Sequence, residues 1–224
     1  MTATIETRIV DTHHHDAFDL TRALPAGLQA VFLKATEGRD WKDPLFAQRF
    51  ADAKNAGVLV GAYHFASGSA PGATQADFFI ARVREVAGCA MGDVLLVLDW
   101  EKNDGKAGDM SVANAEQFVT RVRDVTGRWP VLYSFTSYLQ SKLPGRSAVL
   151  ARCPLWQAQY GERPSAPASP TWDRIALWQY TNGGAGPRDT ARFPRSFPGF
   201  GGCDRSAFDG DASALRAWWQ SAGR

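Results

Sequence analysis

The stretch VLLVLDWE, residues 94–101, decides the fold of this chain of 224 residues. It is an almost continuous apolar run that ends in two acidic residues, Asp99 and Glu101. An uninterrupted apolar run of strand length is typical of a β-strand that is covered on both faces, as strands in parallel α/β sheets are. The stretch therefore predicts a buried strand whose C-terminal end carries two carboxylates.

Strand-like and helix-like segments alternate on both sides of this stretch. Helices are predicted after Asp43-Pro44 and up to Gly57, over residues 73–87, from the cap Ser111 to Gly127, and after the cap Asp211. Strands are predicted at residues 7–12, 30–38, 59–65, 94–100, 130–135, 154–160, 174–180 and 203–209.

This alternation is typical of a parallel sheet with crossover helices. Eight strands in a chain of this length favour a closed barrel over an open sheet. The last strands have short connections without clear helices, and residues 182–202 form a long stretch rich in Gly, Pro and Arg. We therefore predict an α/β fold, a modified and irregular (β/α) TIM-like barrel, as one domain over residues 1–224.

Composition and charge exclude several classes of protein. Hydrophobic residues make up 45% of the chain, which is enough to bury a core without disulfides or metals. The formal net charge is only +2, and no Lys/Arg block of the kind that binds nucleic acid is present. Three widely spaced cysteines form neither a disulfide framework nor a zinc motif. No apolar run approaches the roughly 20 residues that span a membrane.

Polar side chains gather where the predicted strands end. Catalytic groups of parallel barrels lie at the C-terminal ends of the strands. Successive strands end in or near Asp11 and His13, Glu37, Tyr63, Asp99 and Glu101, Tyr133, and Trp178 and Gln179, and the last strand begins near Asp204. Five acids around one barrel mouth exceed what solubility requires, so we predict an acidic site there.

The spacing of Asp99 and Glu101 points to acid–base chemistry. Residues i and i+2 of a strand share a face and lie roughly 7 Å apart. Repulsion between two such carboxylates raises the pKa of one of them, and a carboxylic acid that stays protonated near neutral pH can act as a general acid. Glycoside hydrolysis needs one such acid and one carboxylate that stabilises positive charge on the sugar. The alternative for this pair alone is a strand end with solvated acids.

The order of motifs along the chain resembles glycoside hydrolase family 25, the lysozymes or N-acetylmuramidases. The resemblance runs from Asp11 to the final helix, through KATEG (34–38), Asp43-Pro44, GAYHF (61–65), LDWE (98–101), WQY (178–180) and Cys203-Asp204. It implies a modified β/α barrel that hydrolyses the β-1,4 bond between N-acetylmuramic acid and N-acetylglucosamine in peptidoglycan. It also implies that no cofactor and no metal are needed.

The resemblance also assigns roles to residues. It implies that Glu101 is the proton donor and that Asp99 orients the acetamido group of the substrate and balances the oxocarbenium charge. Asp11 and Asp204 correspond to two further acids of such sites. Residues that would contact the sugar are Glu37, Tyr63, Tyr133, Trp178 and Gln179. Family members often begin with a D-V-S-x-x-Q-type segment, whereas this chain has His13, His14 and His15 after Asp11, so His13 is a substrate-binding candidate particular to it.

Other functions are open on the sequence alone. The His run, with His64, permits a metal site of the amidohydrolase type, although such sites need further histidines on later strands. A non-catalytic glycan-binding barrel is a second alternative, but binding does not require the acid pair. A glycosidase that acts on chitin-like N-acetylglucosamine polymers is a third, and the catalytic residues do not separate it from a muramidase.

Peptidoglycan is the expected partner, and we expect a monomer. The N-terminal residues MTATIETRIVD (1–11) lack the apolar core of a secretory signal. We therefore expect the protein to reach the cell wall by a non-classical route, through phage-type lysis or dedicated export, and otherwise to be cytoplasmic.

Overall fold

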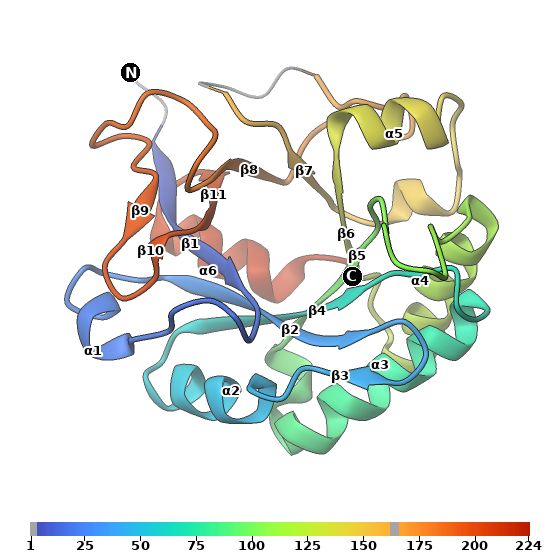
Figure 1. The fold of residues 1–224 in the computed structure, drawn as a ribbon, viewed down its shortest axis with the longest axis horizontal. Helices are drawn as coiled ribbons and strands as arrows, with labels where there is room; N and C mark the ends of the chain where they lie inside the picture. The colour runs from blue at the N-terminus through green and yellow to red at the C-terminus, as the bar shows by residue number, and fades with distance from the viewer. Residues whose placement is uncertain (1–3, 162–165) are drawn as a thin grey trace.

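The computed structural model describes residues 4–161 and 166–224, and its centre is a closed barrel of eight strands (Figure 1). Going round the barrel, the strands follow the order β1, β2, β4, β5, β6, β7, β8 and β11, and β1 pairs with β11 to close the ring. Their bounds are Ile5–Thr12 (β1), Ala30–Glu37 (β2), Leu59–Phe65 (β4), Leu95–Asp99 (β5), Val131–Phe135 (β6), Leu155–Ala158 (β7), Leu177–Asn182 (β8) and Asp204–Asp209 (β11). The predicted irregular TIM-like barrel is confirmed.

One strand makes the barrel irregular. Neighbours from β1 to β8 pair in parallel, whereas β11 is antiparallel to both β8 and β1. Because β11 runs the other way, its first residue, Asp204, lies at the same end of the barrel as the C-terminal ends of the other strands. Short strands outside the ring are Trp41–Lys42 (β3), Ser196–Phe197 (β9) and Gly201–Gly202 (β10).

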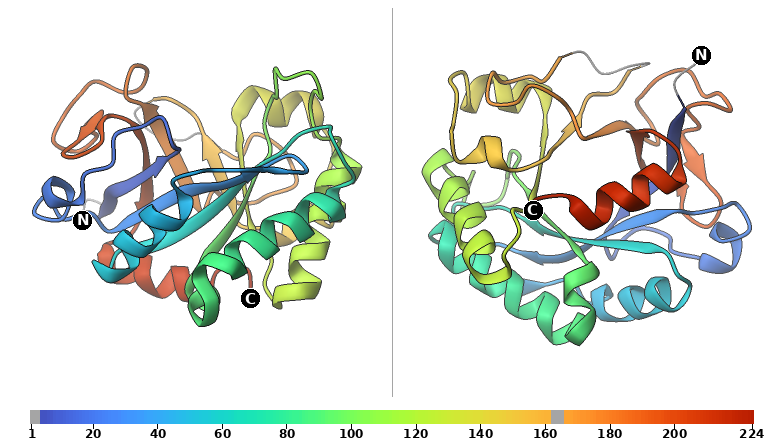
Figure 2. Two further views of the ribbon diagram at one scale, coloured as in Figure 1. Left: turned by 60° about the horizontal axis from the view of Figure 1, so that its bottom comes forward. Right: turned by 180° about the vertical axis from the view of Figure 1, so that it is seen from behind.

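Helices cover only part of the barrel. They span Leu20–Ala23 (α1), Phe46–Asn55 (α2), Gly72–Ala87 (α3), Val112–Thr126 (α4), Thr136–Lys142 (α5) and Ala212–Ser221 (α6), with 3-10 turns at Gly88–Asp93 (η1) and Leu150–Arg152 (η2). Figure 2 shows α2, α3 and α4 side by side along β2, β4 and β5, whereas loops run along β8 and β11. The strands that lack a crossover helix thus form one side of the barrel.

Local sequence explains where several helices begin. Ser111 and Asp211 cap α4 and α6 by accepting hydrogen bonds from the backbone N–H groups of Asn114 and Ala214, as predicted. The prediction for Asp43 needs correction, because α2 begins at Phe46. The Asp43 carboxylate instead accepts the backbone N–H of Leu45 at 2.9 Å and so shapes the turn before the helix.

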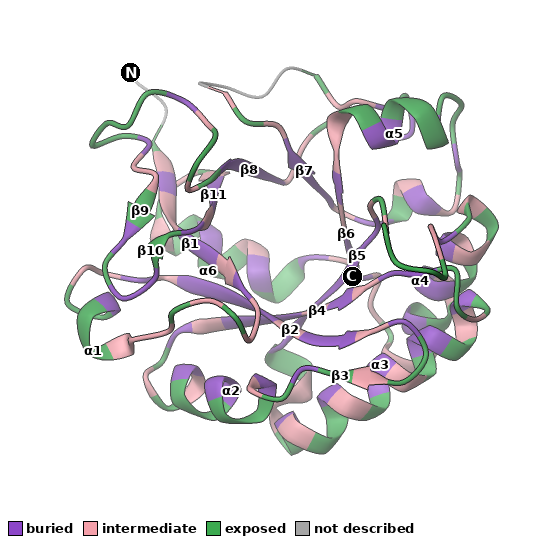
Figure 3. Ribbon diagram, in the orientation of Figure 1, coloured by how far each residue is buried: buried purple, intermediate pink, exposed green. Residues whose placement is uncertain are grey.

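Two hydrophobic layers hold the barrel together. The layer between strands and helices contains Phe50, Phe79, Phe118 and their neighbours, and it appears as buried strand faces and half-buried helices in Figure 3. The interior of the barrel is filled by Ile9, Phe32, Val97 and Trp156, and helix α6 closes its lower end with Leu215 and Trp219. The barrel is therefore packed at the end that α6 covers.

Among the described residues no helix is long and apolar enough to cross a membrane. The three cysteines are free thiols, with Cys153 and Cys203 buried and Cys89 exposed.

Candidate active site

A cavity of about 410 Å³ opens at the C-terminal ends of the barrel strands. Every strand of the ring contributes to its wall. Four acids line it together with aromatic and polar side chains; the lining residues are Asp11, His13, Lys34, Tyr63, Phe65, Val97, Asp99, Glu101, Tyr133, Trp156, Tyr160, Gln179, Asn182 and Asp204. The structure thus brings together most of the residues that the strand ends predicted.

Side-chain alternation on β5 explains why Asp99 and Glu101 meet in this cavity. Trp100, which lies between them, is fully buried on the outer side of the strand. Its indole Nε1–H donates to the backbone oxygen of Met110 at 2.9 Å, and its backbone N–H donates to Tyr133 on β6. These bonds fix the strand end, so that the residues before and after Trp100 both point inward.

Gln179 on β8 holds Asp11 in place. Its amide Nε2 donates to both carboxylate oxygens of Asp11, at 3.1 and 3.0 Å. Its amide oxygen accepts from the hydroxyl of Tyr133 at 2.9 Å and from that of Tyr160 at 3.4 Å. Gln179 is only 2% exposed, and it connects one carboxylate with two tyrosines from within the wall of the cavity.

Burial among like charges raises the pKa of every carboxyl group in the cavity. Loss of hydration, with the charge of Asp204 next, raises the pKa of Glu101 to about 7. Loss of hydration, with the charge of Asp16 next, raises the pKa of Asp204 to about 6. The pKa values of Asp11 and Asp99 also lie well above their usual range, because burial and the neighbouring charges of Asp204 and Glu101, respectively, disfavour ionisation. The site therefore holds protons at neutral pH that ordinary carboxyl groups have lost.

One carboxylate oxygen of Asp99 lacks a hydrogen-bond partner. Asp99 is 8% exposed, and its Oδ1 is buried and accepts no hydrogen bond from the described residues. A buried acceptor without a partner costs free energy. Asp99 is thus ready to accept a hydrogen bond from a donor on a bound molecule.

Lys34 supplies the positive charge of the cavity. Its ammonium group lies 4.7 Å from the centre of the Phe65 ring and 2.7 Å from the carboxylate of Glu37. The β2–β4 register shifts between Lys34 and Thr36, which makes room for one extra residue. This bulge places both Lys34 and Glu37 on the inner side of β2. Lys34 also lowers the pKa values of Asp99 and Glu101, against the larger effect of burial.

The histidine run lies at the rim of the cavity. His13 lines the cavity, and its Nδ1 lies 2.7 Å from the carboxylate of Asp16. The His14 ring lies 3.0 Å from the carboxylate of Asp43 and packs against Trp41. Within the described residues, no group of three or more His, Cys, Asp or Glu side chains is arranged to hold a metal ion.

Residues 10–188 match the protein family described as Glycosyl hydrolases family 25. The chain belongs to glycosyl hydrolase family 25. It is therefore a glycoside hydrolase, and the resemblance inferred from its motifs is confirmed.

Relatives of this family 25 enzyme agree with that assignment. Lysozyme M1 of Streptomyces globisporus is 30% identical over 217 residues, which cover 92% of this chain and 68% of that protein. An N,O-diacetylmuramidase of Chalaropsis sp is 33% identical over 182 residues, or 73% of this chain and 83% of that protein. The crystal structure of the bacterial lysozyme from Streptomyces coelicolor superposes with a TM-score of 0.77 at 28% identity and covers 99% of both chains.

Two sequence-predicted residues of the family 25 site do not line its cavity. Trp178 does not line the cavity, because it precedes Gln179 on β8 and points to the opposite face, where it contacts Tyr180 and Phe193. Assigning both neighbours to one sugar-binding wall overlooked strand alternation. Glu37 is not among the lining residues either, and it acts on the cavity through its ion pair with Lys34.

Several residues of the family 25 cavity were not singled out by the sequence reasoning. Lys34 is the most informative, and its signal was a lone lysine within the apolar strand AVFLKATE. Trp156 also reaches the cavity, and its Nε1–H donates to Ser206. Asn182 enters from the end of β8. His64, in contrast, has a structural role, because it is buried between Thr36 and Gln75, at 2.8 and 3.1 Å.

Proposed function

We propose that this enzyme is a muramidase that hydrolyses the β-1,4 bond between N-acetylmuramic acid and N-acetylglucosamine in peptidoglycan. The observation that carries the proposal is a carboxyl group with a pKa of about 7, Glu101, beside a second carboxyl, Asp99, with an unpartnered oxygen. Membership of family 25 and the names of the lysozyme and muramidase relatives support the polymer.

Glu101 acts as the general acid. It donates its proton to the glycosidic oxygen as the bond to the anomeric carbon breaks, so that the leaving sugar departs as an alcohol. The cavity favours this role because burial and the charge of Asp204 keep Glu101 protonated close to neutral pH. Once ionised, Glu101 can accept a proton from the water that completes hydrolysis.

Asp99 assists through the substrate. Its free oxygen accepts the N–H of the acetamido group on the sugar whose bond is cleaved, which directs the acetamido oxygen toward the anomeric carbon. Positive charge that develops on the sugar is then balanced by Asp99, with Asp11 and Asp204 nearby. We propose that the reaction retains configuration at the anomeric carbon, either by this substrate assistance or through a covalent intermediate.

Aromatic and amide groups position the sugar. Tyr63, Tyr133 and Trp156 present ring edges and faces to the cavity, which suits the apolar faces of a pyranose ring. Gln179 keeps Asp11 and Tyr133 fixed while substrate enters. We assign His13, at the rim, to contacts with the glycan beyond the cleaved sugar.

The test is the chemistry of the new chain ends. Purified peptidoglycan is digested with the enzyme, its reducing ends are reduced with borohydride, and the fragments are analysed by mass spectrometry. We expect reduced N-acetylmuramic acid at the new ends. Reduced N-acetylglucosamine alone, or cleavage of peptide bonds, would refute the proposal, and cleavage of chitin oligomers at a comparable rate would favour the chitinase alternative.

A further inference from the structure

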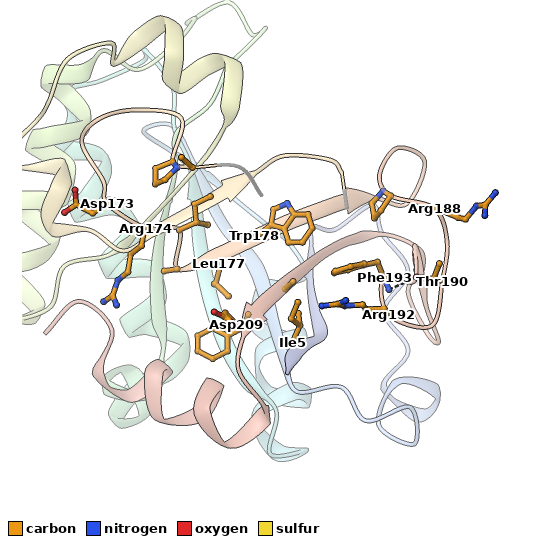
Figure 4. Close-up of a pocket in the computed structure, with 17 residues that line it drawn as sticks. Ile5, Asp173, Arg174, Leu177, Trp178, Arg188, Thr190, Arg192, Phe193 and Asp209 are labelled. Carbon is orange, nitrogen blue, oxygen red and sulfur yellow. Dashed lines mark hydrogen bonds between the residues drawn. The ribbon is translucent and has the colours of Figure 1, made fainter. Parts of the chain in front are cut away.

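A second, larger cavity lies on the outside of the barrel, on the side that lacks crossover helices (Figure 4). Its volume is about 910 Å³, within the range of ligand sites. It lies against the outer faces of β8 and β11, and parts of the chain before β8 and after it form its rim. We call this cavity the outer groove.

The floor of the outer groove is apolar. Trp178 and Phe193 contact each other with ring centres 5.5 Å apart, and Ala207 and Ile5 pack beside them. These residues form a small core of their own, separate from the two layers of the barrel. An occupant with small alkyl groups fits this surface.

The rim of the outer groove carries arginines with no ion pair. Arg174, Arg188 and Arg192 are all exposed, and none forms a salt bridge within residues 4–161 and 166–224. Two other arginines of this region behave differently. Arg195 donates to the backbone oxygens of Pro187, Gly184 and Gly186, and Arg205 donates to those of Pro194, Ser196 and Thr7.

This contrast separates two roles. Arg195 and Arg205 donate hydrogen bonds to the backbone of the loop between β8 and β11 and so hold this loop in place. The guanidinium groups of Arg188 and Arg192 remain available, and Arg192 lies over the Phe193 ring at 5.4 Å. Guanidinium groups bind carboxylates through paired hydrogen bonds.

Two acidic residues in the same groove indicate that its ligand also carries positive charge. Figure 4 shows Arg188 and Arg192 toward one end, Asp173 and Arg174 toward the other, and Asp209 between them. Asp173 and Asp209 are exposed and form no salt bridge with the described residues. A uniformly anionic chain would be repelled by them, whereas an occupant with both carboxylates and an amine would be complemented along its length.

We propose that the outer groove binds a stem peptide of peptidoglycan, a class of ligand that carries carboxylates, alanine methyl groups and the amine of a diamino acid. This inference rests on the proposed function, because peptidoglycan is the polymer that brings stem peptides to the enzyme. Carboxylates pair with Arg188 and Arg192, methyl groups lie on Trp178 and Phe193, and the amine lies near Asp209.

The position of the groove suits a second contact with the same polymer. Trp178 and Gln179 are neighbours on β8, yet one faces the outer groove and the other the catalytic cavity. Peptidoglycan whose stem peptide is bound in the outer groove therefore presents its glycan strands to the catalytic cavity at high effective concentration. The groove would favour cross-linked wall over bare glycan.

The test is binding of a defined peptide. The tetrapeptide L-Ala-γ-D-Glu-diaminopimelate-D-Ala is titrated into the full chain by calorimetry, with Glu101→Gln in all variants. We expect Arg188→Gln/Arg192→Gln to weaken binding about tenfold, the effect of losing charge-assisted hydrogen bonds. The matched control Arg123→Gln/Arg216→Gln removes the same charge from α4 and α6, outside the groove, and should bind as the parent does.

Three results would overturn the proposal: no binding of the tetrapeptide to the parent, equal weakening in both double variants, or unchanged binding in the groove variant. A second measurement uses sacculi freed of wall teichoic acid, with or without their stem peptides. We expect the groove variant to lose the preference for peptide-bearing sacculi, and retention of that preference would contradict it. Failure of the proposed function would show separately, as a digest by the enzyme with Glu101 intact that contains no reduced N-acetylmuramic acid.

Discussion

Two charged neighbours of Glu101 should shift the pH dependence of activity in opposite directions when they are replaced. A general acid must be protonated, so activity should fall as the pH rises through its pKa, about 7. The negative charge of Asp204 raises this pKa, and the positive charge of Lys34 lowers it. Asp204→Asn should therefore move the basic limb of the pH profile to lower pH, and Lys34→Met should move it to higher pH.

The size of the shift follows from Coulomb's law. Two unit charges about 6 Å apart interact by about 3 kcal/mol at an effective dielectric constant of about 20, which equals about two pH units. Glu101 and Asp204 both keep some contact with solvent, so we halve this value. Asp204 has a pKa of about 6 and is mostly ionised where Glu101 titrates. We expect a shift of about one pH unit in each direction.

The assay is kcat/KM on solubilised peptidoglycan strands between pH 4 and 9 at constant ionic strength. The position of the basic limb is the readout, because either substitution also lowers the rate itself. Lys42→Met is a matched control, since Lys42 forms its ion pair with Glu85 on the surface. Basic limbs that stay together within about 0.3 pH units, or that both move the same way, would refute our account of Glu101.

Three further predictions concern metal, stability and the charge of the cavity. Dialysis against EDTA should leave activity unchanged, and a loss that zinc restores would revive the histidine–metal alternative. His64 has a pKa of about 4 in the fold, below its ordinary 6.5, because it is buried, so its contribution to stability is present above pH 6.5 and is lost as the pH falls toward 4. Between pH 7 and 4.5, the free energy of unfolding measured with urea should fall by about 2–3 kcal/mol less in His64→Gln than in the parent. An equal fall in both proteins would contradict this. Burial and the charge of Asp204 raise the pKa of Asp11, so this group stabilises the fold at low pH and that contribution is lost as the pH rises. The change in Tm caused by Asp11→Asn should therefore be more favourable at pH 8 than at pH 4; calorimetry that shows equal effects at both would argue against it.

The sequence predicted the barrel because its signals are local. The apolar run before Asp99 and the capping residues Ser111 and Asp211 act within a few residues of themselves. The convergence of strand ends then follows from the topology of parallel barrels. That β11 is antiparallel was not predicted, because direction depends on a long loop whose course is set by tertiary contacts such as those of Arg205.

Side-chain direction along a strand was the weak point of the predicted site. Alternation along a strand was applied to Asp99 and Glu101 but not to Trp178 and Gln179, and it places Trp178 outside. Between Lys34 and Thr36 a bulge interrupts alternation and places both Lys34 and Glu37 on the inner side of β2, and only pairing with the neighbouring strand reveals a bulge. The outer groove was not predicted from the sequence. It forms where loops, and no crossover helix, run along β8 and β11, and its lining residues lie far apart in the described chain.

The most direct test of the central claim is the rate of Glu101→Gln on purified peptidoglycan, measured beside Glu85→Gln, a surface variant of the same kind. Loss of the general acid should lower kcat by about 10²–10⁴-fold with an unchanged Tm. Glu85→Gln should keep the parent rate. If Glu101→Gln retains activity within tenfold of the parent while remaining folded, Glu101 is not the acid that cleaves the glycosidic bond.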